Sequence, residues 1–204
     1  MKKYPRTYHL PWSEGRTLDD KTLLNVDHFI GKEVVVTEKM DGENTSIYQD
    51  YIHARSLDSN NHPSRDWVKA WASTWQFELP DSYRICGENL YAKHSIPYNN
   101  LKSYFYGFSV WKDELCLSWK DTIEWFDLLG IVPVPVLYNG IYDQSIIQTL
   151  WNESIEGYVV RLASEFDYID FDRCVAKFVR KNHVQTDEHW MQTTVVPNKL
   201  IDNQ

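Results

Sequence analysis

The sequence predicts an α+β protein, because it contains segments typical of strands and segments typical of helices. Two runs of β-branched and aromatic residues near position 40 fit the pleated surface of a sheet. Three tryptophans, Trp67, Trp71 and Trp75, instead recur at the four-residue spacing of an amphipathic helix. The chain has 204 residues, with nine Trp, thirteen Tyr and eight Phe, and can bury a substantial core. We therefore expect residues 1–204 to form a single domain.

A short polar turn holds Lys39 between two strand-type runs. Residues 34–37 precede it, residues 45–48 follow it, and Asp41-Gly42 supplies the turn. Lys39 therefore stands at the end of a strand, where a pocket can lower the pKa of its amine and make it a nucleophile. The simpler alternative is a surface lysine in an ordinary hairpin, which this turn cannot exclude by itself.

Three segments farther along the chain also have strand character. They cover residues 51–56, 156–161 and 175–179. The last two bring charged side chains, among them Glu156 and Lys177, into otherwise apolar runs. A charge in such a run is costly unless it has a partner or a ligand, so these segments indicate a binding site.

Helices are expected over residues 17–24, between Pro63 and Pro80, and over residues 122–129, which Gly130 ends. The tryptophan stripe could form a platform for nucleic-acid bases. Because helical spacing is what packing requires, we interpret it instead as a face of the core. Residues 132–136 alternate valine with proline, so they must be extended, as an edge strand or a connector.

The chain carries 21 Lys and Arg against 29 Asp and Glu, a formal net charge of −8. Contacts with phosphates need clustered Lys and Arg, so this balance argues against indiscriminate binding of nucleic acid but allows a local basic groove. Such a cluster occurs near one place, with Arg173, Lys177, Arg180 and Lys181. We therefore expect weak, site-directed contact with nucleic acid.

Cysteine usage and the N-terminus indicate a soluble protein of the reducing cytoplasm. Cys86, Cys116 and Cys174 are scattered and form no Cys-x-x-Cys pattern, which argues against a disulfide framework or a zinc site. The N-terminus has two lysines but no apolar run behind them, and no stretch approaches the length of a membrane span. His183 and His189 flank two carboxylates, but their spacing matches no established zinc pattern, and we interpret them as part of a surface tail.

Five segments resemble, in order, the nucleotidyltransferase motifs of the superfamily of covalent lysine ligases and mRNA capping enzymes. They are residues 39–44, 83–91, 104–110, 156–161 and 175–177. Asn44, which ends the first segment, is typical of the ATP-dependent RNA ligase branch. Residues 4–13 and 180–185 also resemble a group of small RNA ligases. The resemblance thus covers nearly the whole chain, and five ordered motifs are far more specific than one.

This resemblance implies a nucleotidyltransferase (adenylation) domain with two mostly antiparallel sheets, peripheral helices and the nucleotide between the sheets. It implies ATP-dependent RNA ligation, in which the enzyme takes AMP on Lys39, passes it to an RNA 5′-phosphate and joins a 3′-hydroxyl to that end. The expected cofactors are ATP and Mg²⁺, with Mn²⁺ as a substitute. The expected partners are RNA ends undergoing repair and a protein that processes them. We expect a monomer with no membrane contact and no added domain.

Three charged residues are assigned to the chemistry. Lys39 is expected to attack the α-phosphate of ATP, while Lys177 neutralises the charge that builds up as pyrophosphate leaves. The positive charge of Lys177 is also expected to lower the pKa of Lys39. Glu156 is the expected Mg²⁺ ligand, because this ion takes one or two carboxylates and keeps several waters. The alternatives are a turn cap for Glu156 and a snorkelling strand residue for Lys177.

The other assignments follow from the resemblance. Nucleotide contacts are expected from Glu38, Arg55, Glu88, Phe108, Glu156, Lys177 and Lys181, and RNA contacts from Asn44 and Arg55. Phe105 and Phe108 lie on opposite faces of one strand, so only one can stack on adenine, and we prefer Phe108. Glu88 is expected to hold the ribose and Glu38 the adenine amino group. Lys181 is included because Val179 stands where the family commonly has a second lysine.

Two other functions fit the same motifs. One is GTP-dependent guanylyl transfer of the capping type, and the other is a non-catalytic module that binds RNA ends. The second is disfavoured because a binding module needs no nucleophile, yet Lys39, Glu88, Glu156 and Lys177 are all present. The sequence leaves open whether the RNA is a nicked duplex, a broken tRNA loop or a single strand, and whether DNA is tolerated.

Overall fold

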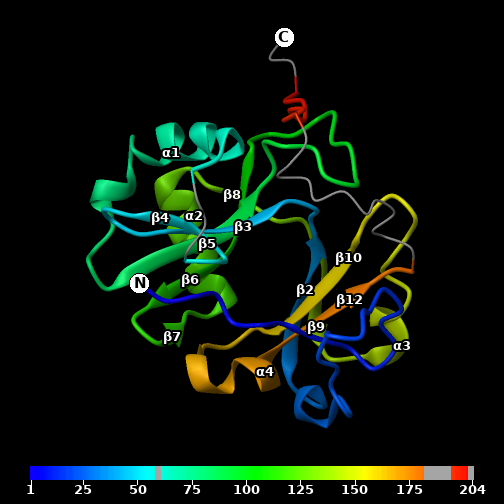
Figure 1. Cartoon of the computed structure of the whole chain (residues 1–204). Coiled ribbons are helices and arrows are strands. Elements are labelled where there is room, and N and C mark those ends of the chain that lie inside the picture. Colours follow the sequence, from blue (N-terminus) through cyan, green and yellow to red (C-terminus); the bar gives the residue numbers. More distant parts are fainter. Residues whose placement is uncertain (58–60, 182–193, 202–204) are drawn as a thin grey trace.

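Two β-sheets form the centre of the molecule in a computed structural model that describes residues 1–57, 61–181 and 194–201 (Figure 1). The first sheet, sheet A, has the order β1 (Tyr8–His9), β12 (Val175–Val179), β10 (Gly157–Leu162), β2 (Glu33–Lys39) and β9 (Val136–Ile141). Its neighbours are antiparallel except for the parallel pair β1 and β12.

The second sheet, sheet B, has the order β11 (Phe166–Asp167), β7 (Leu115–Cys116), β6 (Phe105–Lys112), β5 (Tyr83–Asn89), β3 (Glu43–Ile47) and β4 (Ile52–Ala54). A short strand, β8 (Val132–Pro133), lies parallel beside β6. The strands of the main path are all antiparallel to their neighbours. The expected extended conformation of residues 132–136 is confirmed, since β8 and the start of the edge strand β9 cover most of it.

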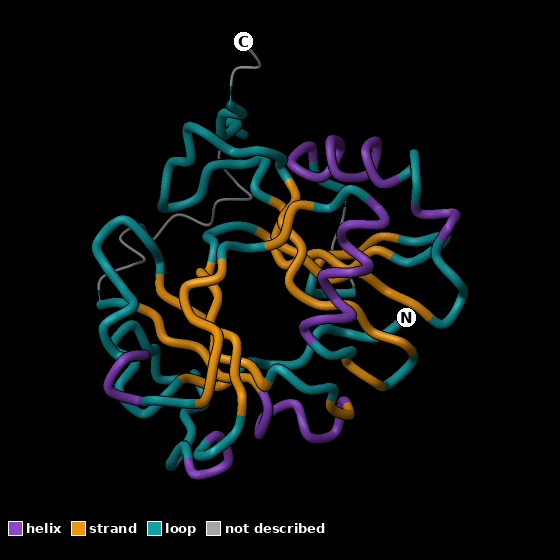
Figure 2. Tube along the Cα trace, turned by 180° about the vertical axis from the view of Figure 1, so that it is seen from behind, coloured by secondary structure: helices purple, strands orange, loops and turns teal. Residues whose placement is uncertain are grey.

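Short helices surround the sheets (Figure 2). The α-helices are α1 (Asp66–Ala72), α2 (Trp119–Leu129), α3 (Gln144–Ile147) and α4 (Phe171–Cys174), and the 3-10 helices are η1 (Asp27–Phe29), η2 (Pro63–Arg65), η3 (Gln76–Glu78) and η4 (Tyr168–Asp170). This mixture of mainly antiparallel sheets and peripheral helices confirms the predicted α+β class. No helix in the described residues is both long and apolar enough to cross a bilayer.

The turn after Lys39 passes from one sheet to the other. Strand β2 pairs with β10 and β9 in sheet A, whereas β3 pairs with β5 and β4 in sheet B. The two strands therefore do not form a hairpin, and the alternative of a surface lysine in an ordinary hairpin is wrong. Gly42 is required at this crossing, because a Cβ there would lie 2.5 Å from the backbone oxygen of Asn89.

The two predicted helices beyond residue 60 are confirmed. Ser118 caps α2 by accepting a hydrogen bond from the Asp121 backbone N–H at 3.1 Å, and Gly130 ends the helix in the left-handed conformation with φ 65°. The tryptophan stripe packs as a core face, since Trp75 is buried and Trp71 lies against the buried ring of Phe105 at 5.2 Å. The core interpretation of the stripe is therefore confirmed.

The helix expected over residues 17–24 is wrong. Asp20 Oδ2 accepts hydrogen bonds from both the backbone N–H and the hydroxyl of Thr17, each at 3.0 Å, and this closes a turn instead. Thr22 then bridges to His9. The side chain of Asp20 satisfies the backbone locally, and the bridge to β1 competes with helix formation.

A core shared by both sheets holds them together. Cys86 and Trp111 of sheet B are fully buried in the same cluster as Val34 and Tyr158 of sheet A. The three cysteines are free thiols and are buried. The C-terminal segment 194–201 also packs onto the body of the protein, where it bridges to residues 92 and 101.

Candidate active site

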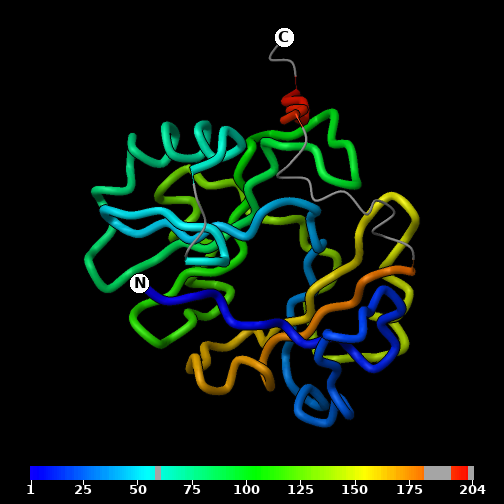
Figure 3. The backbone as a smooth tube through the Cα atoms, viewed as in Figure 1, coloured from blue at the N-terminus to red at the C-terminus, as the bar shows by residue number. Residues whose placement is uncertain are grey.

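A cavity of about 250 Å³ lies where the two sheets face each other. Its walls come from the end of β2, from β10, β12 and β6, and from the N-terminal segment, which crosses between the sheets (Figure 3). Of the residues assigned from sequence, the cavity is lined by Glu38, Lys39, Asn44, Arg55, Glu88, Phe108 and Lys177. Residues that are far apart in the chain thus meet at one place.

Lys39 and Lys177 project from the same face of sheet A. Lys39 is in register with Gly157, and Lys177 is in register with Val159, two positions along the same middle strand. Side chains two residues apart share a face of a strand, so the two ammonium groups face the same cavity. Burial, together with the positive charge of Lys39, lowers the pKa of Lys177.

Lys39 forms an ion pair with Glu156, at 2.6 Å between Nζ and Oε1. Glu156 immediately precedes β10 and is buried. Burial lowers the pKa of Lys39, but the negative charge of Glu156 and, at the high pH where Lys39 titrates, that of Glu88 outweigh burial, and the pKa lies above its ordinary value. The net pKa shift of Lys39 in this state is thus opposite to the lowering expected from Lys177, because the attraction of the carboxylates dominates.

Glu88 is in register with Asn44 on the neighbouring strand and faces Lys39. Burial raises the pKa of Glu88 to about 8, since the attraction of Lys39 only partly offsets the cost of desolvating the carboxylate. The Glu88 carboxyl is thus largely protonated at neutral pH and can donate as well as accept hydrogen bonds.

Phe108 lines the cavity because strand β6 is irregular there. Cys86 pairs with Ser109 and Gly87 pairs with Gly107, so Phe108 is an extra residue opposite this step. Its ring contacts Tyr4 edge-on at 5.3 Å. Phe105 is fully buried in the core instead. Phe108 is therefore the ring of the two that a ligand in the cavity can reach.

The remaining assigned residues differ in their placement. The Arg55 backbone N–H donates to the Asn44 backbone oxygen at 3.0 Å, so these two cavity residues lie side by side. Glu38 is half-buried, and burial raises its pKa. Lys181 lies outside the cavity lining, exposed in a turn two residues past the end of β12. His183 and His189 lie outside the described residues.

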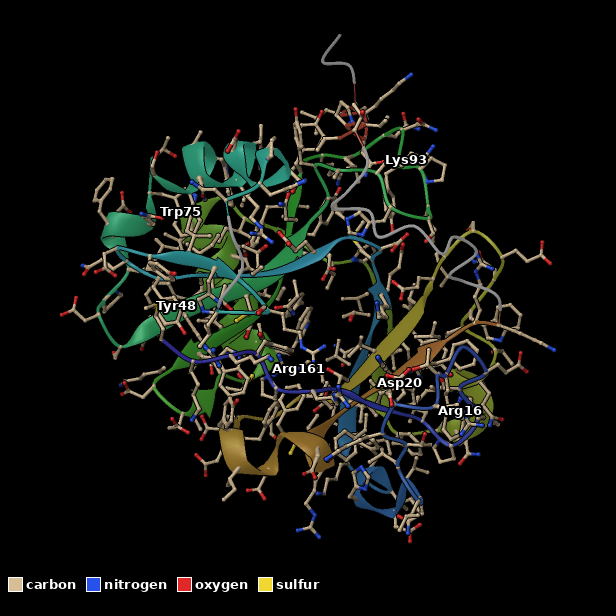
Figure 4. All side chains as sticks on the ribbon, viewed as in Figure 1. Arg16, Asp20, Tyr48, Trp75, Lys93 and Arg161 are labelled. Carbon is tan, nitrogen blue, oxygen red and sulfur yellow. The ribbon has the colours of Figure 1, made fainter. Side chains whose placement is uncertain are left out.

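The cavity is also lined by residues that were not assigned from sequence. Among them are Tyr4, Arg6, Asp20 and Arg161. Arg161 is buried on the cavity floor, where Nη2 donates to the Leu117 oxygen at 2.8 Å, and Figure 4 shows it between the sheets. The resemblance of residues 4–13 to small RNA ligases was the signal for the N-terminal part, but it named no individual side chain.

Basic residues dominate the cavity although the whole chain carries a net charge of −8. The basic lining residues are Arg6, Lys39, Arg55, Arg161 and Lys177, and the acidic ones are Asp20, Glu38 and Glu88. Because Glu88 is largely protonated below pH 8, the cavity attracts an anionic ligand. The described residues contain no group of three or more His, Cys, Asp or Glu that could hold a metal by themselves.

The structure thus has two sheets and, between them, an anion-attracting cavity with a lysine that is a candidate nucleophile. Comparisons with known proteins identify the family. The sequence model described as RNA ligase matches residues 32–179. The chain therefore belongs to the RNA ligase family. No match was found among curated proteins.

Solved structures with the same fold include RNA ligases from two sources. An archaeal ATP-dependent RNA ligase superposes with a TM-score of 0.58 and 16% identity, over 88% of this chain and 48% of that one. The Naegleria gruberi RNA ligase with PPi superposes with a TM-score of 0.54 and 16% identity, over 88% of this chain and 61% of that one. A variant of that ligase with ATP and Mn has a TM-score of 0.54 and 15% identity, over 88% of this chain and 60% of that one. The chain thus spans about half to three-fifths of the proteins it matches.

Proposed function

We propose that this protein is an ATP-dependent RNA ligase that forms a covalent lysine–AMP intermediate on Lys39. The observation that carries this proposal is the placement of Lys39 at a strand end, inside an anion-attracting cavity and on the same sheet face as Lys177. Membership in the RNA ligase family and the fold shared with ATP-dependent RNA ligases support it.

Three group transfers make up the proposed reaction. The Lys39 amine, after losing a proton, attacks the α-phosphorus of ATP, and the bond to pyrophosphate breaks. The 5′-phosphate of RNA then attacks the same phosphorus, which frees Lys39 and leaves AMP joined to the RNA end. Finally the 3′-hydroxyl of a second end loses its proton, attacks the RNA phosphorus and releases AMP.

The cavity residues suit these steps. Lys177 would offset the charge on the leaving pyrophosphate, and Glu88 would hydrogen-bond the ribose. Phe108 would stack on adenine from its partly exposed position on β6. Glu38 and Lys181 remain candidates for nucleotide contacts, and Lys181 would have to approach from outside the cavity.

Mg²⁺ or Mn²⁺ is the proposed divalent cofactor, because ATP phosphates carry charge that the protein cations only partly neutralise. Glu156 is the proposed protein ligand, since it is buried beside Lys39 and a hard cation prefers oxygen. The absence of a larger acidic cluster among the described residues fits an ion held mostly by phosphates and water. A solved Naegleria relative with ATP and Mn supports this choice.

The proposed RNA substrate is a pair of ends already aligned by base pairing, for repair. A protein of net charge −8 grips RNA weakly, and pre-alignment removes the entropic cost of bringing two ends together. Sealing should therefore fall steeply with salt, while adenylation of Lys39 changes little. We further propose a monomeric protein of the cytoplasm, assisted by a partner that prepares RNA ends, and its three free cysteines suit that compartment.

Covalent labelling tests this function directly. Incubation with α-labelled ATP and Mg²⁺, followed by denaturing electrophoresis, should label the wild-type protein. Lys39→Ala should abolish the label, and Lys39→Arg should do the same because a guanidinium does not lose its proton at working pH. A nicked, splinted RNA with a 5′-phosphate should then be sealed.

Other outcomes would favour the competing functions. Persistent labelling of Lys39→Ala would remove Lys39 as the nucleophile. Equal or stronger labelling by α-labelled GTP would favour guanylyl transfer of the capping type. RNA-end binding without any label in the wild type would indicate a non-catalytic binding module.

A further inference from the structure

The first residues of the chain form a strap that joins the two sheets. The Lys2 backbone N–H donates to Oη of Tyr48, which directly follows β3, at 3.0 Å, and Nη1 of Arg84 on β5 of sheet B donates to the Lys2 backbone oxygen at 2.7 Å. Six residues later, Tyr8 and His9 pair with β12 of sheet A. Figure 3 shows this segment running from one sheet to the other. We call residues 2–9 the N-terminal strap, and it lies outside the residues that the family model matches.

Arg6 lies on the part of the strap that borders the cavity. Residues 4–7 all line the cavity, and Arg6 itself is exposed at its edge. Its Nη1 donates to the Asp19 backbone oxygen at 3.0 Å, which holds the guanidinium at the cavity with other N–H groups left to bind a ligand. Within the described part of the chain Arg6 forms no ion pair.

Arg6, Arg55, Lys177 and Lys39 are basic residues that all line the cavity. The charge of Arg55 acts on Lys177, whose pKa is lowered chiefly by burial and then by Lys39. Arg55 in turn has a lowered pKa, because of burial and then the positive charge of Arg6. The charges of Arg6 and Arg55 therefore repel each other, Asp20 offsets part of this repulsion, and an anion bound between the two arginines would relieve the rest.

The exposure of Arg6 and Arg55 indicates which anion these two arginines bind. Lys39 and Lys177 line the cavity and are partly buried, and the proposed reaction places the reacting phosphorus of ATP beside them. Arg55 is tied to Asn44, which the RNA ligase resemblance places near RNA. Arg6 and Arg55 both line the cavity and are both exposed, so a long polymer can reach them from outside.

We propose that Arg6, together with Arg55, binds the terminal 5′-phosphate of the RNA strand that is to be activated. A phosphate monoester carries more charge and more free oxygens than an internal phosphodiester, and a guanidinium can bind it with two parallel hydrogen bonds. Arg6 thus distinguishes a 5′-phosphate end from a 5′-hydroxyl end. The substrate named here rests on the proposed ligase function.

Binding of two matched RNA oligonucleotides, one with a 5′-phosphate and one with a 5′-hydroxyl, tests this inference without ATP. The wild-type protein should prefer the 5′-phosphate RNA by about 10-fold, and Arg6→Gln should reduce the preference below about 2-fold. Arg6→Lys should retain part of it, because the charge stays but the paired donors are lost. Self-adenylation of Arg6→Gln is measured alongside, because Arg6 lines the same cavity as Lys39 and a role toward ATP would appear as a loss in that assay.

Arg16→Gln is the matched control. Arg16 is an exposed arginine of the same N-terminal region, it does not line the cavity, and it points away from the gap between the sheets in Figure 4. The Arg16→Gln variant has the same change in net charge as Arg6→Gln. Because Arg16 lies outside the cavity lining, this variant should keep the full preference for the 5′-phosphate RNA. A similar loss in both variants would show that only overall charge matters and would overturn the proposal.

Two further results would also overturn it. One is an unchanged 5′-phosphate preference in Arg6→Gln, or none in the wild type. The other is a large loss of self-adenylation in Arg6→Gln, which would place Arg6 on the phosphates of ATP. Failure of the proposed ligase function would give a different result. The wild-type protein would then show no covalent label from α-labelled ATP, whatever its preference for RNA ends.

Discussion

Lys39 Nζ and Glu156 Oε1 lie 2.6 Å apart, so the proposed nucleophile is held as an ammonium by a buried carboxylate. An ammonium has no lone pair and cannot attack phosphorus. The pairing stabilises Lys39 in position but opposes its deprotonation. Any positive charge brought to Glu156 weakens the pairing and lowers the pKa of Lys39. The proposed metal ligand and the proposed nucleophile are thus electrostatically coupled.

Glu156→Gln should make the Lys39 amine react at lower pH. The change removes the nearest negative charge that holds the pKa of Lys39 up. Modification of Lys39 by a small amine-specific reagent, followed by mass spectrometry across pH without ATP, measures this directly. Glu38→Gln is the control, because Glu38 is not among the charges that shift Lys39. Identical pH profiles for wild type and Glu156→Gln would contradict the coupling.

Lys177→Ala should slow formation of the lysine–AMP adduct by on the order of 100-fold or more, as the loss of one preorganised electrostatic contact does. Its fold should persist, because Lys177 is only half-buried and its strand keeps its backbone pairing. Single-turnover labelling at saturating ATP gives the rate, and circular dichroism checks the fold. Wild-type rates would return Lys177 to the role of a snorkelling strand residue.

Glu88→Gln should remove a pH dependence of stability. The pKa of Glu88 is about 8 in the folded state and near the ordinary glutamate value of 4.5 in the unfolded chain. Between these values the folded protein binds more protons than the unfolded chain, so the Glu88 contribution to the free energy of unfolding falls as pH rises. Urea unfolding at pH 5 and pH 8 should show a smaller decline for Glu88→Gln than for wild type. Equal declines would mean that Glu88 is ionised throughout.

Phe105→Ala and Phe108→Ala should have different effects. Phe105 is fully buried against Trp71, and its removal should cost about 3–5 kcal/mol of unfolding free energy. Phe108 is partly exposed in the cavity, so its removal should cost less stability and mainly raise the ATP concentration needed for half-maximal labelling. Urea denaturation and an ATP titration separate the two effects. A normal ATP requirement in a folded Phe108→Ala protein would remove Phe108 from the base site.

Asn198→Ala should destabilise the protein by roughly 1–3 kcal/mol, because a buried amide with several partners is lost. Asn198 Oδ1 accepts from the Tyr98 N–H at 2.9 Å, and Nδ2 donates to the Leu90 oxygen at 2.8 Å. Tyr98 Oη in turn accepts from the Asp41 N–H at 2.9 Å, next to the nucleophile turn. Adenylation should therefore slow as well. The exposed Asn152→Ala control should change stability by less than about 0.5 kcal/mol, and an equal effect in both would contradict this reading.

Local pattern was sufficient for most of the elements. The spacing of the tryptophans marked α1, Gly130 marked the end of α2, and β-branched runs marked β2, β3 and β12. These predictions succeed because side-chain periodicity and turn chemistry act within a few residues. The prediction over residues 17–24 failed because other contacts overrode the local preference for a helix. The Asp20 carboxylate accepts a hydrogen bond from the Thr17 N–H, and Thr22 bridges to β1.

The sequence by itself determined the order of the motifs, the α+β class and the choice of Lys39 as candidate nucleophile. Only the tertiary structure decided that β2 and β3 belong to different sheets, that Phe108 rather than Phe105 reaches the cavity, and that Arg6 borders it. It also reversed the expected pKa shift of Lys39. A pKa depends on burial and on which charges lie within a few ångströms, and the distance between Lys39 and Glu156 is set by the pairing of β2 with β10 rather than by their spacing in the chain.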